Sequence, residues 1–502
     1  MTQTVAALLE TAPASQRALT APGRTDLSYG ALRDVVARVR RQLAARGIGP
    51  GDRVAIVLPN GPEMAVAFLA VASGASAAPL NPAYKLAEYE FYLSDLAPKL
   101  VLLAPGSDNP VRQAADGLGI AVVELQVEPG APAGAFTLWD EEAEPTLPNP
   151  SDEALVLHTS GTTSRPKVVP LSQANLCASA RNIAQTLELT TQDHCLNVMP
   201  LFHIHGLVAV VLASVRAGAS VCCTPGFNAL SFFGLAVEQQ PTWYSAVPTM
   251  HQAIVQRAAR NADALSQIAF RFVRSSSASL PGPVFHGLEQ TFHCPVIEAY
   301  GMTEAAHQMA SNPLTHGGQR SGFVGRAAGP EIRILDGAGG TVAVGLEGEV
   351  CIRGDNVTAG YENNPTANAS GFFDDWFRTG DQGFLDDAGY LKITGRIKEI
   401  INRGGEKISP LEVDEVLLSC PGVAQAVTFA VPHESYGEDV AAAVVLAEGA
   451  VIGAADVRDH AARSLSAYKV PRKIVILDEI PKGATGKVQR IGLAKVLGLG
   501  GQ

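Results

Sequence analysis

The sequence has few cysteines, and their spacing argues against a disulfide framework and against a CxxC motif. Seven cysteines are scattered over 502 residues, and none of them forms a CxxC pair. A disulfide framework places an even number of cysteines at short spacings, whereas an odd and dispersed set is typical of a reducing compartment. We therefore expect a cytoplasmic protein with free thiols.

Long hydrophobic runs and an excess of basic residues are also lacking. The most apolar stretch, AVAFLAVASGASAAPL from Ala65, is interrupted by Gly, Ser and Pro, which argues against a membrane span. The N-terminus MTQTVAALLETAP lacks the basic start of a signal peptide, and the chain ends GLGGQ rather than with an SKL-type address. The net charge of −11 disfavours a nucleic-acid partner. We expect no membrane or nucleic-acid partner.

The chain is too long for one ordinary core, and its first part alternates between helical and strand patterns. Apolar residues recur at helical spacing from Leu32 to Leu43, and the strand pattern RVAIVLP follows. A helix from Glu63, a strand near Ala78 and the strand KLVLLAP continue the series. This alternation predicts an α/β fold with parallel sheets covered on both faces.

The sequence pattern changes twice in the second half of the chain. From about Gly325, turns rich in Gly and Asp separate short runs such as GEVCIRG and GYLKITG, which predicts a β-rich subdomain. After Arg396 a small α+β unit begins, in which basic residues cluster. The cluster fits either an anionic ligand or a solvated basic face. We predict a large domain over residues 1–397 and a small one over 398–502.

The segment TSGTTSRPK, residues 159–167, follows the strand pattern ALVLHTS and is rich in hydroxyls. Pro166 precedes Lys167 where a Walker A loop needs glycine, so the segment is not that motif. By itself it fits either a phosphate-binding loop or a polar surface turn. Four further motifs follow in order: EAYGMTE (298–304), RTGD (378–381), GRIKEIINRGGEKISP (395–410) and PKGATGK (481–487).

These five ordered motifs resemble those of the adenylate-forming acyl-CoA synthetase superfamily, over nearly the whole chain. The resemblance implies that ATP and coenzyme A are co-substrates and that Mg²⁺ is the cofactor. An acid carboxylate would attack the α-phosphorus of ATP, and a thiol would then displace AMP. Ser164 and Val168 depart from the family's usual glycines in the loop.

The resemblance also implies the roles of individual residues. Lys487 would stabilise charge at the α-phosphate, Glu304 and Thr162 would hold Mg²⁺, and His203 would separate the acyl and thiol tunnels. The nucleotide would be bound by Thr159, Ser160, Gly161, Thr162, Thr163, Lys167, Ala278, Glu298, Ala299, Tyr300, Gly301, Thr303, Asp381 and Arg396. The small domain would be mobile, rotating about a hinge at Lys398, and Gly404 and Gly405 would lie against the pantetheine of coenzyme A.

Three polar residues are expected in the acid pocket. His205, Ser277 and His307 would line it, which suits a small acid with a second carboxylate better than a fatty chain. We read PLFHIHG as a strand, so that one register would exchange His205 for His203. EAYGMTEAAHQMASNPL and INRGGEKISP resemble the plant and fungal ligases of oxalate and coenzyme A, which makes oxalate the expected substrate.

Other functions stay open at this point. Malonate or glyoxylate could replace oxalate as the acid. A catalytically silent nucleotide-binding module would lack the catalytic residues that Lys487 and Glu304 represent, and a luciferase-like oxygenase would need a larger apolar pocket. The protein could be a monomer or a homodimer.

Overall fold

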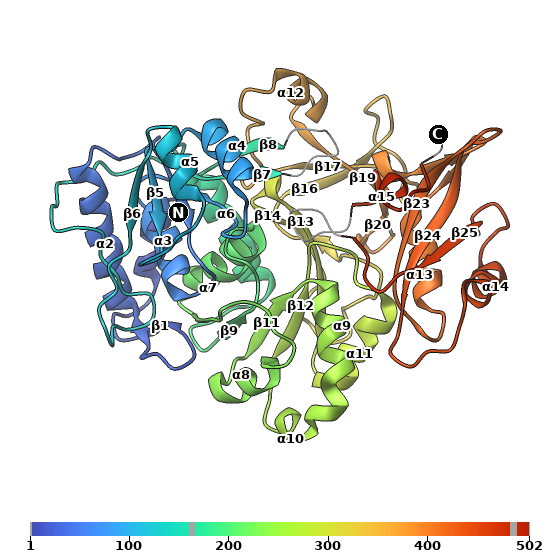
Figure 1. Ribbon diagram of the computed structural model, residues 1–502, viewed down its shortest axis with the longest axis horizontal. Coiled ribbons are helices and arrows are strands. Elements are labelled where there is room, and N and C mark those ends of the chain that lie inside the picture. Colours follow the sequence, from blue (N-terminus) through green and yellow to red (C-terminus); the bar gives the residue numbers. More distant parts are fainter. Residues whose placement is uncertain (1–2, 160–165, 482–488, 501–502) are drawn as a thin grey trace.

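The computed structural model describes residues 3–159, 166–481 and 489–500. Within these ranges the strands form four sheets, of six, nine, five and five strands. Figure 1 shows the two larger sheets with their helices in the N-terminal part of the chain, and the smaller sheets toward the C-terminus. The expected fold class is confirmed: an α/β N-terminal region, a β-rich subdomain and a small α+β region.

The six-stranded sheet has the order β6–β5–β3–β4–β7–β8 and is parallel except for the last pair. Its strands are β3 (Arg53–Val57), β4 (Ser76–Pro79), β5 (Leu100–Leu103), β6 (Ala121–Glu124), β7 (Glu153–Thr159) and β8 (Lys167–Ser172). The helices that alternate with them are α2 (Tyr29–Ala45), α3 (Pro62–Ala72), α4 (Leu86–Leu96) and α5 (Val111–Gly117). The helix and strand predictions for this region are therefore confirmed.

The nine-stranded sheet has the order β15–β14–β13–β12–β11–β9–β10–β1–β2. Its strands are β1 (Arg17–Thr20), β2 (Leu27–Ser28), β9 (His194–Asn197), β10 (Ser220–Cys223), β11 (Trp243–Ala246), β12 (Phe272–Ser275), β13 (Val296–Met302), β14 (His307–Ser311) and β15 (Arg326–Ala327). Because β9, β11, β12 and β13 are parallel, their carboxyl ends meet at one edge. Ligands of α/β proteins commonly bind at such an edge.

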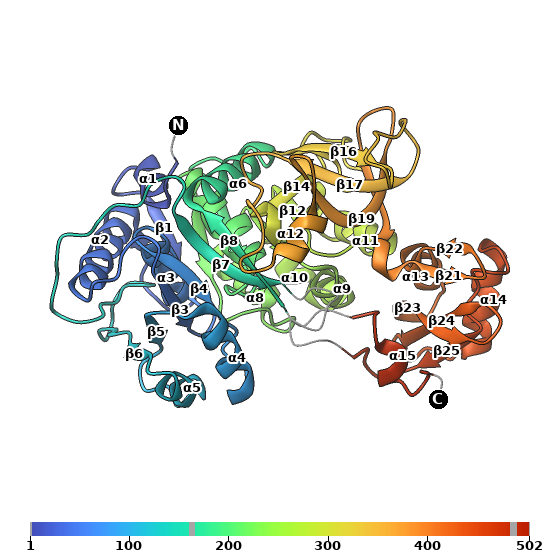
Figure 2. The ribbon, with the colours of Figure 1, turned by 90° about the horizontal axis from the view of Figure 1, so that it is seen from above.

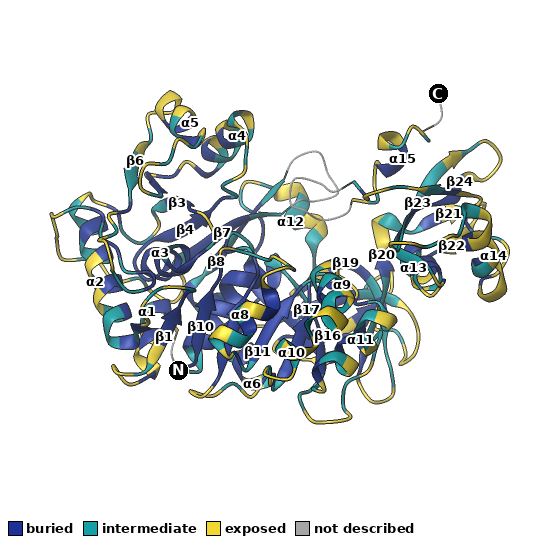
Figure 3. Cartoon of the chain, turned by 60° about the horizontal axis from the view of Figure 1, so that its bottom comes forward, coloured by how far each residue is buried: buried dark blue, intermediate teal, exposed yellow. Residues whose placement is uncertain are grey.

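Helices of the N-terminal region enclose these strands. They include α1 (Val5–Leu8), α6 (Gln173–Thr186), α7 (Ala213–Arg216), α8 (Phe232–Gln239), α9 (Pro248–Arg257), α10 (Ala262–Leu265) and α11 (Gly282–Phe292). Figure 3 shows the strands as the buried layers and the outer helix faces as the exposed ones. Among the described helices, none is both long and apolar enough to cross a bilayer.

The chain passes once from the first five-stranded sheet to the second, between Arg396 and Ile401. The first contains β16 (Glu331–Leu335), β17 (Gly348–Arg353), β18 (Phe372–Phe373), β19 (Trp376–Leu385) and β20 (Leu391–Arg396), with α12 (Pro365–Gly371) beside it. The second contains β21 (Ile401–Arg403), β22 (Glu406–Ile408), β23 (Val423–His433), β24 (Gly437–Leu446) and β25 (Lys473–Ile476), with α13 (Pro410–Leu418), α14 (Ala454–Ser464) and α15 (Leu493–Val496). Figure 2 shows this second sheet standing to one side of the rest.

The strand expected in PLFHIHG is wrong. His203 lies in a turn, and a π-helix, η2 (His205–Leu212), begins two residues later. Every residue of η2 is buried, and a short apolar run of this kind does not distinguish a strand from a buried helix. A Cβ on Gly206 would lie 2.5 Å from the carbonyl oxygen of Pro200, so the helix starts where only glycine fits. No strand register therefore relates the two histidines.

Candidate active site

The carboxylate of Asp381 lies at the centre of the predicted nucleotide site. Arg396 is its register partner across β19 and β20, and the Arg396 Nε lies 2.8 Å from Asp381 Oδ1. The hydroxyl of Tyr300 donates to Asp381 Oδ2. Burial raises the pKa of Asp381, while the charge of Arg396 and the Tyr300 hydroxyl oppose that shift. The structure thus brings together three predicted residues, Asp381, Arg396 and Tyr300, of which Tyr300 is partly exposed.

Glu304, the predicted magnesium ligand, is buried next to Lys167. The hydroxyl of Tyr361 donates to Glu304 Oε1 over 2.9 Å, and the Lys167 Nζ lies 4.2 Å from the centre of the Tyr361 ring. The backbone N–H of Thr358 donates to the Glu304 carbonyl oxygen over 2.7 Å. The sequence analysis did not single out Tyr361, which contacts Glu304 through its hydroxyl and Lys167 through the face of its ring.

Arg396 and Lys398, two cations of one distant segment, lie close enough to Lys167 for their charges to act on it. Burial lowers the pKa of Lys167; the carboxylate of Glu304 opposes the shift, and the charges of Lys398 and Arg396 add to it. Like charges repel, so a protein holds three of them close together at a cost that an anionic ligand offsets. Mg²⁺ in nucleotide sites is commonly held by one or two carboxylates and the substrate phosphates, and the position of Glu304 fits that role.

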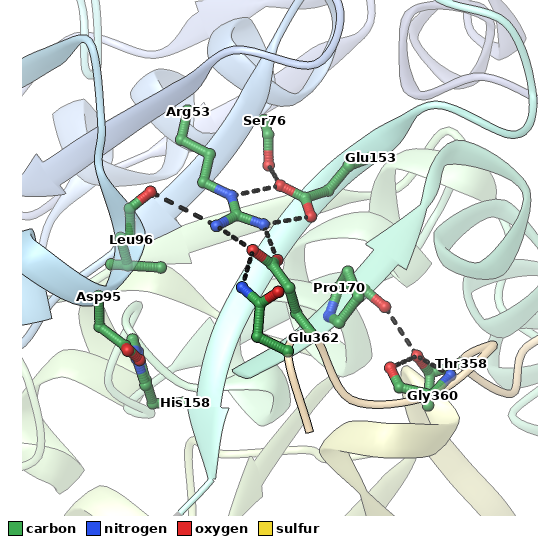
Figure 4. Close-up of polar contacts among 11 residues, drawn as sticks. Arg53, Ser76, Asp95, Leu96, Glu153, His158, Pro170, Thr358, Gly360 and Glu362 are labelled. Atoms are coloured by element: carbon green, nitrogen blue, oxygen red, sulfur yellow. Dashed lines mark hydrogen bonds and ion pairs between the residues drawn. The ribbon is translucent and has the colours of Figure 1, made fainter. Parts of the chain in front are cut away.

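The segment of residues 358–362 fastens the β7–β8 hairpin beside the site, as Figure 4 shows. The Thr358 hydroxyl donates to the carbonyl oxygen of Pro170 over 2.8 Å, and the Glu362 N–H donates to that of Val168 over 3.1 Å. Arg53 from β3 joins Glu362 to Glu153 at the start of β7. These bonds fix the strand that carries Lys167.

The expected acid-binding residues come together at the carboxyl edge of the nine-stranded sheet. His205 Nδ1 lies 3.0 Å from the Ser277 hydroxyl, and the centres of the His205 and His307 rings are 5.0 Å apart. Ser277 has a φ of 74° and His307 a φ of 102°, in the left-handed region that side chains other than glycine rarely adopt. Strained backbone persists where surrounding structure enforces it, and it concentrates at functional sites.

Two buried residues behind this cluster were missed by the sequence analysis. Arg274 in β12 is fully buried, and its Nη1 lies 3.3 Å from the hydroxyl of Ser245 in β11. Ser245 in turn lies 2.7 Å from His205 Nε2. The available signal was the arginine itself, since a lone charged residue within the apolar strand FVRS is rarely buried without a purpose.

The other predicted nucleotide contacts occupy different environments. Ala299 and Glu298 are buried, and Glu298 Oε1 accepts from the Leu280 N–H over 3.2 Å. Ala278 is exposed, and Gly301 and Thr303 are partly exposed. A Cβ on Gly301 would lie 2.0 Å from the carbonyl oxygen of His307, which explains the glycine. Their contacts with a nucleotide stay predictions.

The glycine pair of the small region forms a hairpin turn. Gly404 has a φ of 60° and Gly405 a φ of 99°, and together they join β21 to β22. Positive φ at both central residues is typical of the turn that links two-residue hairpins, so the fold alone already requires glycine there. Lys398 is exposed in the short helix η5 (Ile397–Glu399), between the last strand of one sheet and the first of the next.

The remaining predicted residues belong to the hydroxyl-rich segment and to the motif PKGATGK. Thr159 is the last residue of β7 and pairs with Lys167. The residues that lie outside the described ranges are Ser160, Gly161, Thr162, Thr163 and Lys487. Their roles rest on the sequence motifs.

Two related sequences cover almost the whole chain. Over 485 residues it is 46% identical to an oxalate–CoA ligase of Arabidopsis thaliana, with 95% of this chain and 94% of that protein covered. Over 473 residues it is 41% identical to an oxalate–CoA ligase of Saccharomyces cerevisiae, with 88% and 86% covered.

Two solved structures of one protein, in its ATP-bound and apo states, share the fold of this chain. ATP-bound MatB from Rhodopseudomonas palustris superposes with a TM-score of 0.87 at 30% sequence identity, covering 99% of each chain. Apo MatB gives a TM-score of 0.78 at the same identity and coverage. The arrangement of this chain is thus more similar to the ATP-bound state.

The family comparison agrees with this likeness. Residues 412–487 match the AMP-binding enzyme C-terminal domain, and residues 7–362 match the AMP-binding enzyme family itself. With most of its length matched by that family, and with relatives above 40% identity along nearly all of it, the chain belongs to the AMP-binding enzymes.

Proposed function

We propose that this protein is an ATP-dependent ligase that joins oxalate to coenzyme A. In the first half-reaction an oxalate carboxylate attacks the α-phosphorus of ATP, giving an oxalyl-adenylate and pyrophosphate. In the second, the thiol of coenzyme A displaces AMP and forms oxalyl-CoA. Two relatives of this specificity, at 46% and 41% identity over most of the chain, support the assignment.

The observation that carries the choice of acid is the cluster of polar side chains around His205. Imidazole and hydroxyl groups from His205, Ser277 and His307 meet there, and the buried cation Arg274 lies behind them. Desolvating these groups against an alkyl chain is unfavourable, whereas a carboxylate can accept a hydrogen bond from a hydroxyl such as that of Ser277. Oxalate offers a second carboxylate directly joined to the reacting one, which suits a small pocket.

The nucleotide half of the site follows from the residues around Asp381 and Glu304. Asp381 would accept hydrogen bonds from the ribose, exchanging them for those it now receives, and the partly exposed face of Tyr300 would stack on the adenine. Lys167, Arg396 and Lys398 supply positive charge for the phosphates. Glu304 would hold Mg²⁺, which neutralises charge on the transferred nucleotide when it is bound.

Adenylation also depends on residues outside the described ranges. By position in PKGATGK, Lys487 would bridge the carboxylate and the α-phosphate, where negative charge develops. The hydroxyl loop ending at Lys167 would surround the β- and γ-phosphates, with Thr162 as a second magnesium ligand.

The second half-reaction would require the small region to turn. The chain changes from one sheet to another between Arg396 and Ile401, which supports a domain boundary at residues 397/398 and a hinge at Lys398. The greater similarity to the ATP-bound relative supports an adenylation-like arrangement. After rotation, Gly404 and Gly405 would approach the pantetheine, with His203 between the two tunnels.

The test is a pair of assays on the purified protein. Oxalate-dependent release of pyrophosphate from ATP without coenzyme A would establish adenylation, and coenzyme A-dependent formation of AMP would establish the ligase. A panel of C2 to C6 acids, with malonate, glyoxylate and propionate, gives the specificity. A larger kcat/KM for malonate or glyoxylate than for oxalate would contradict the assignment of the acid. Loss of pyrophosphate release with every acid would contradict the enzyme class.

A further inference from the structure

A continuous chain of hydrogen-bonding groups runs from the core to the acid pocket. Arg274 Nη1 lies 3.3 Å from the Ser245 hydroxyl, which lies 2.7 Å from His205 Nε2. The opposite ring nitrogen, Nδ1, lies 3.0 Å from the Ser277 hydroxyl. Arg274 and Ser245 are fully buried and are register neighbours in β12 and β11, whereas Ser277 is partly exposed. This chain of hydrogen bonds therefore has a buried end at Arg274 and a partly exposed end at Ser277.

The chemistry of arginine fixes the direction of these bonds. A guanidinium only donates, so the Ser245 oxygen accepts from Arg274 and has one hydrogen left to give. That hydrogen goes to His205 Nε2, which must be an acceptor because Arg274 Nη1 also faces it at 3.5 Å. The ring proton of a neutral His205 then resides on Nδ1 and is donated to the Ser277 oxygen. The Ser277 hydrogen remains for a group in the pocket.

The charge of Arg274 is not balanced by an acid in the described part of the chain. Its hydrogen-bond partners there are the Ser245 hydroxyl, His205 and the Gln308 side-chain oxygen at 3.3 Å. Gln308 presents its oxygen to Arg274 because its amide nitrogen donates to Thr186 and to the carbonyl oxygen of Ala328. The Arg274 Nε has no hydrogen-bond partner among the residues that the structure describes. These three partners are neutral acceptors.

A structural arginine from the same segment shows the contrast. Arg271, three residues earlier, pairs with the carboxylate of Asp193, with its Nε 3.0 Å from Oδ1. Burial lowers the pKa of Arg274 to about 10, so the guanidinium is still charged at neutral pH. A buried cation without a carboxylate is costly unless an anion arrives to face it.

We propose that Arg274 and Ser245 are positioning residues that polarise the chain toward Ser277, so that Ser277 presents a hydroxyl hydrogen to the non-reacting carboxylate of the acid. This inference rests on the proposed function and extends it to two residues that do not touch the substrate. Arg274 acts through Ser245 and His205: it fixes the tautomer of the imidazole and adds a positive potential that favours a second negative charge. A neutral group in the same position would gain less from this positive potential than a carboxylate does.

The first experiment reads the tautomer of His205 without any turnover. In protein labelled with ¹⁵N in its histidine rings, the His205 signals, assigned by their loss in His205→Gln, should show Nδ1 protonated and Nε2 bare. In Ser245→Ala the Nε2 resonance should move, because its donor is gone, and Ser245→Thr should restore it. A proton on Nε2 in the wild-type protein would overturn the proposal whatever the activity of the variants.

The second experiment compares acids with and without the second carboxylate. Ser245→Ala should lower kcat/KM for oxalate by about tenfold to a hundredfold while changing that for glyoxylate by less than about threefold. Arg274→Lys should retain part of the preference, and Arg274→Met should lose it. Calorimetric titration of oxalate into the protein with a non-hydrolysable ATP analogue should report the same order of affinities.

The matched control is Ser220→Ala. Ser220 is a buried serine in the same sheet whose hydroxyl lies 2.8 Å from His194 Nδ1, away from the pocket. Its loss should leave the ratio of the two acids unchanged. Equal losses for oxalate and glyoxylate in Ser245→Ala, with folding intact, would show a merely structural role and overturn the proposal. A wild-type protein without oxalate-dependent activity would instead contradict the proposed function, and the tautomer would still test the chain of hydrogen bonds.

Discussion

Ser277 combines a functional hydroxyl with a strained backbone, so two substitutions at this one position should separate activity from stability. Ser277→Ala removes the hydroxyl and keeps a side chain at a φ of 74°. Ser277→Gly removes the hydroxyl and also allows that φ without strain. We expect both variants to lose selectivity for oxalate, and only the glycine variant to gain stability.

The magnitudes follow from the contacts. A hydrogen bond to a charged acceptor contributes about 1.5–3 kcal/mol, which corresponds to about a 10- to 150-fold fall in kcat/KM for oxalate in both variants. Holding a residue other than glycine in the left-handed region costs about 1–2 kcal/mol. Ser277→Gly should therefore be more stable than Ser277→Ala by about 1 kcal/mol, after allowance for the greater freedom of glycine in the unfolded chain.

The assay is pyrophosphate release with oxalate and with glyoxylate, together with the urea midpoint of each variant. Ser276→Ala serves as the control, because Ser276 is the buried neighbour whose hydroxyl donates to the Ala299 carbonyl oxygen instead of facing the pocket. If Ser277→Ala and Ser277→Gly keep the wild-type ratio of oxalate to glyoxylate, Ser277 does not bind the second carboxylate. If the glycine variant is the less stable one, the φ of 74° is not a source of strain.

Four further outcomes are expected. Lys487→Ala should abolish pyrophosphate release but spare the reaction of supplied oxalyl-adenylate with coenzyme A, and near-normal pyrophosphate release would refute its role. Lys398→Pro fixes φ and should impair AMP formation with coenzyme A more than pyrophosphate release; equal loss of both would point to misfolding. Burial raises the pKa of Glu298 to about 8, so its contribution to stability should fall as pH rises from about 4.5 through 8, and Glu298→Gln should remove that slope in urea titrations from pH 6 to 9. Arg53→Met leaves two facing carboxylates and should cost about 2–4 kcal/mol of unfolding free energy, whereas the same change at the exposed Arg353 should have little effect.

The site depends on segments that the chain order keeps apart. Tyr361 lies between Glu304 and Lys167, and residues 358–362 fasten the hairpin that carries Lys167. A change in Tyr361 would thus disturb the magnesium ligand and the phosphate-binding strand together. This coupling is a property of the folded chain, because the three residues belong to separate elements.

The resemblance that the ordered motifs carry assigned Asp381 and Arg396 to one site, whereas the sequence by itself determined the order of the motifs and the alternation of strands and helices. Such features are local or repeat with a fixed period, so they can be read from neighbouring residues. The choice of His205, Ser277 and His307 as companions likewise came from the family resemblance, and the structure places Ser277 and His307 each beside His205.

Only the tertiary structure decided what lies behind that pocket. PLFHIHG reads equally well as a strand, and it becomes a turn and a π-helix because the surrounding core buries every residue of the helix. Arg274 and Ser245 are 29 positions apart, and nothing in the local sequence of either indicates that parallel pairing of β11 and β12 makes them neighbours. The direction of the hydrogen bonds, and with it the donor offered to the acid, arises from that pairing.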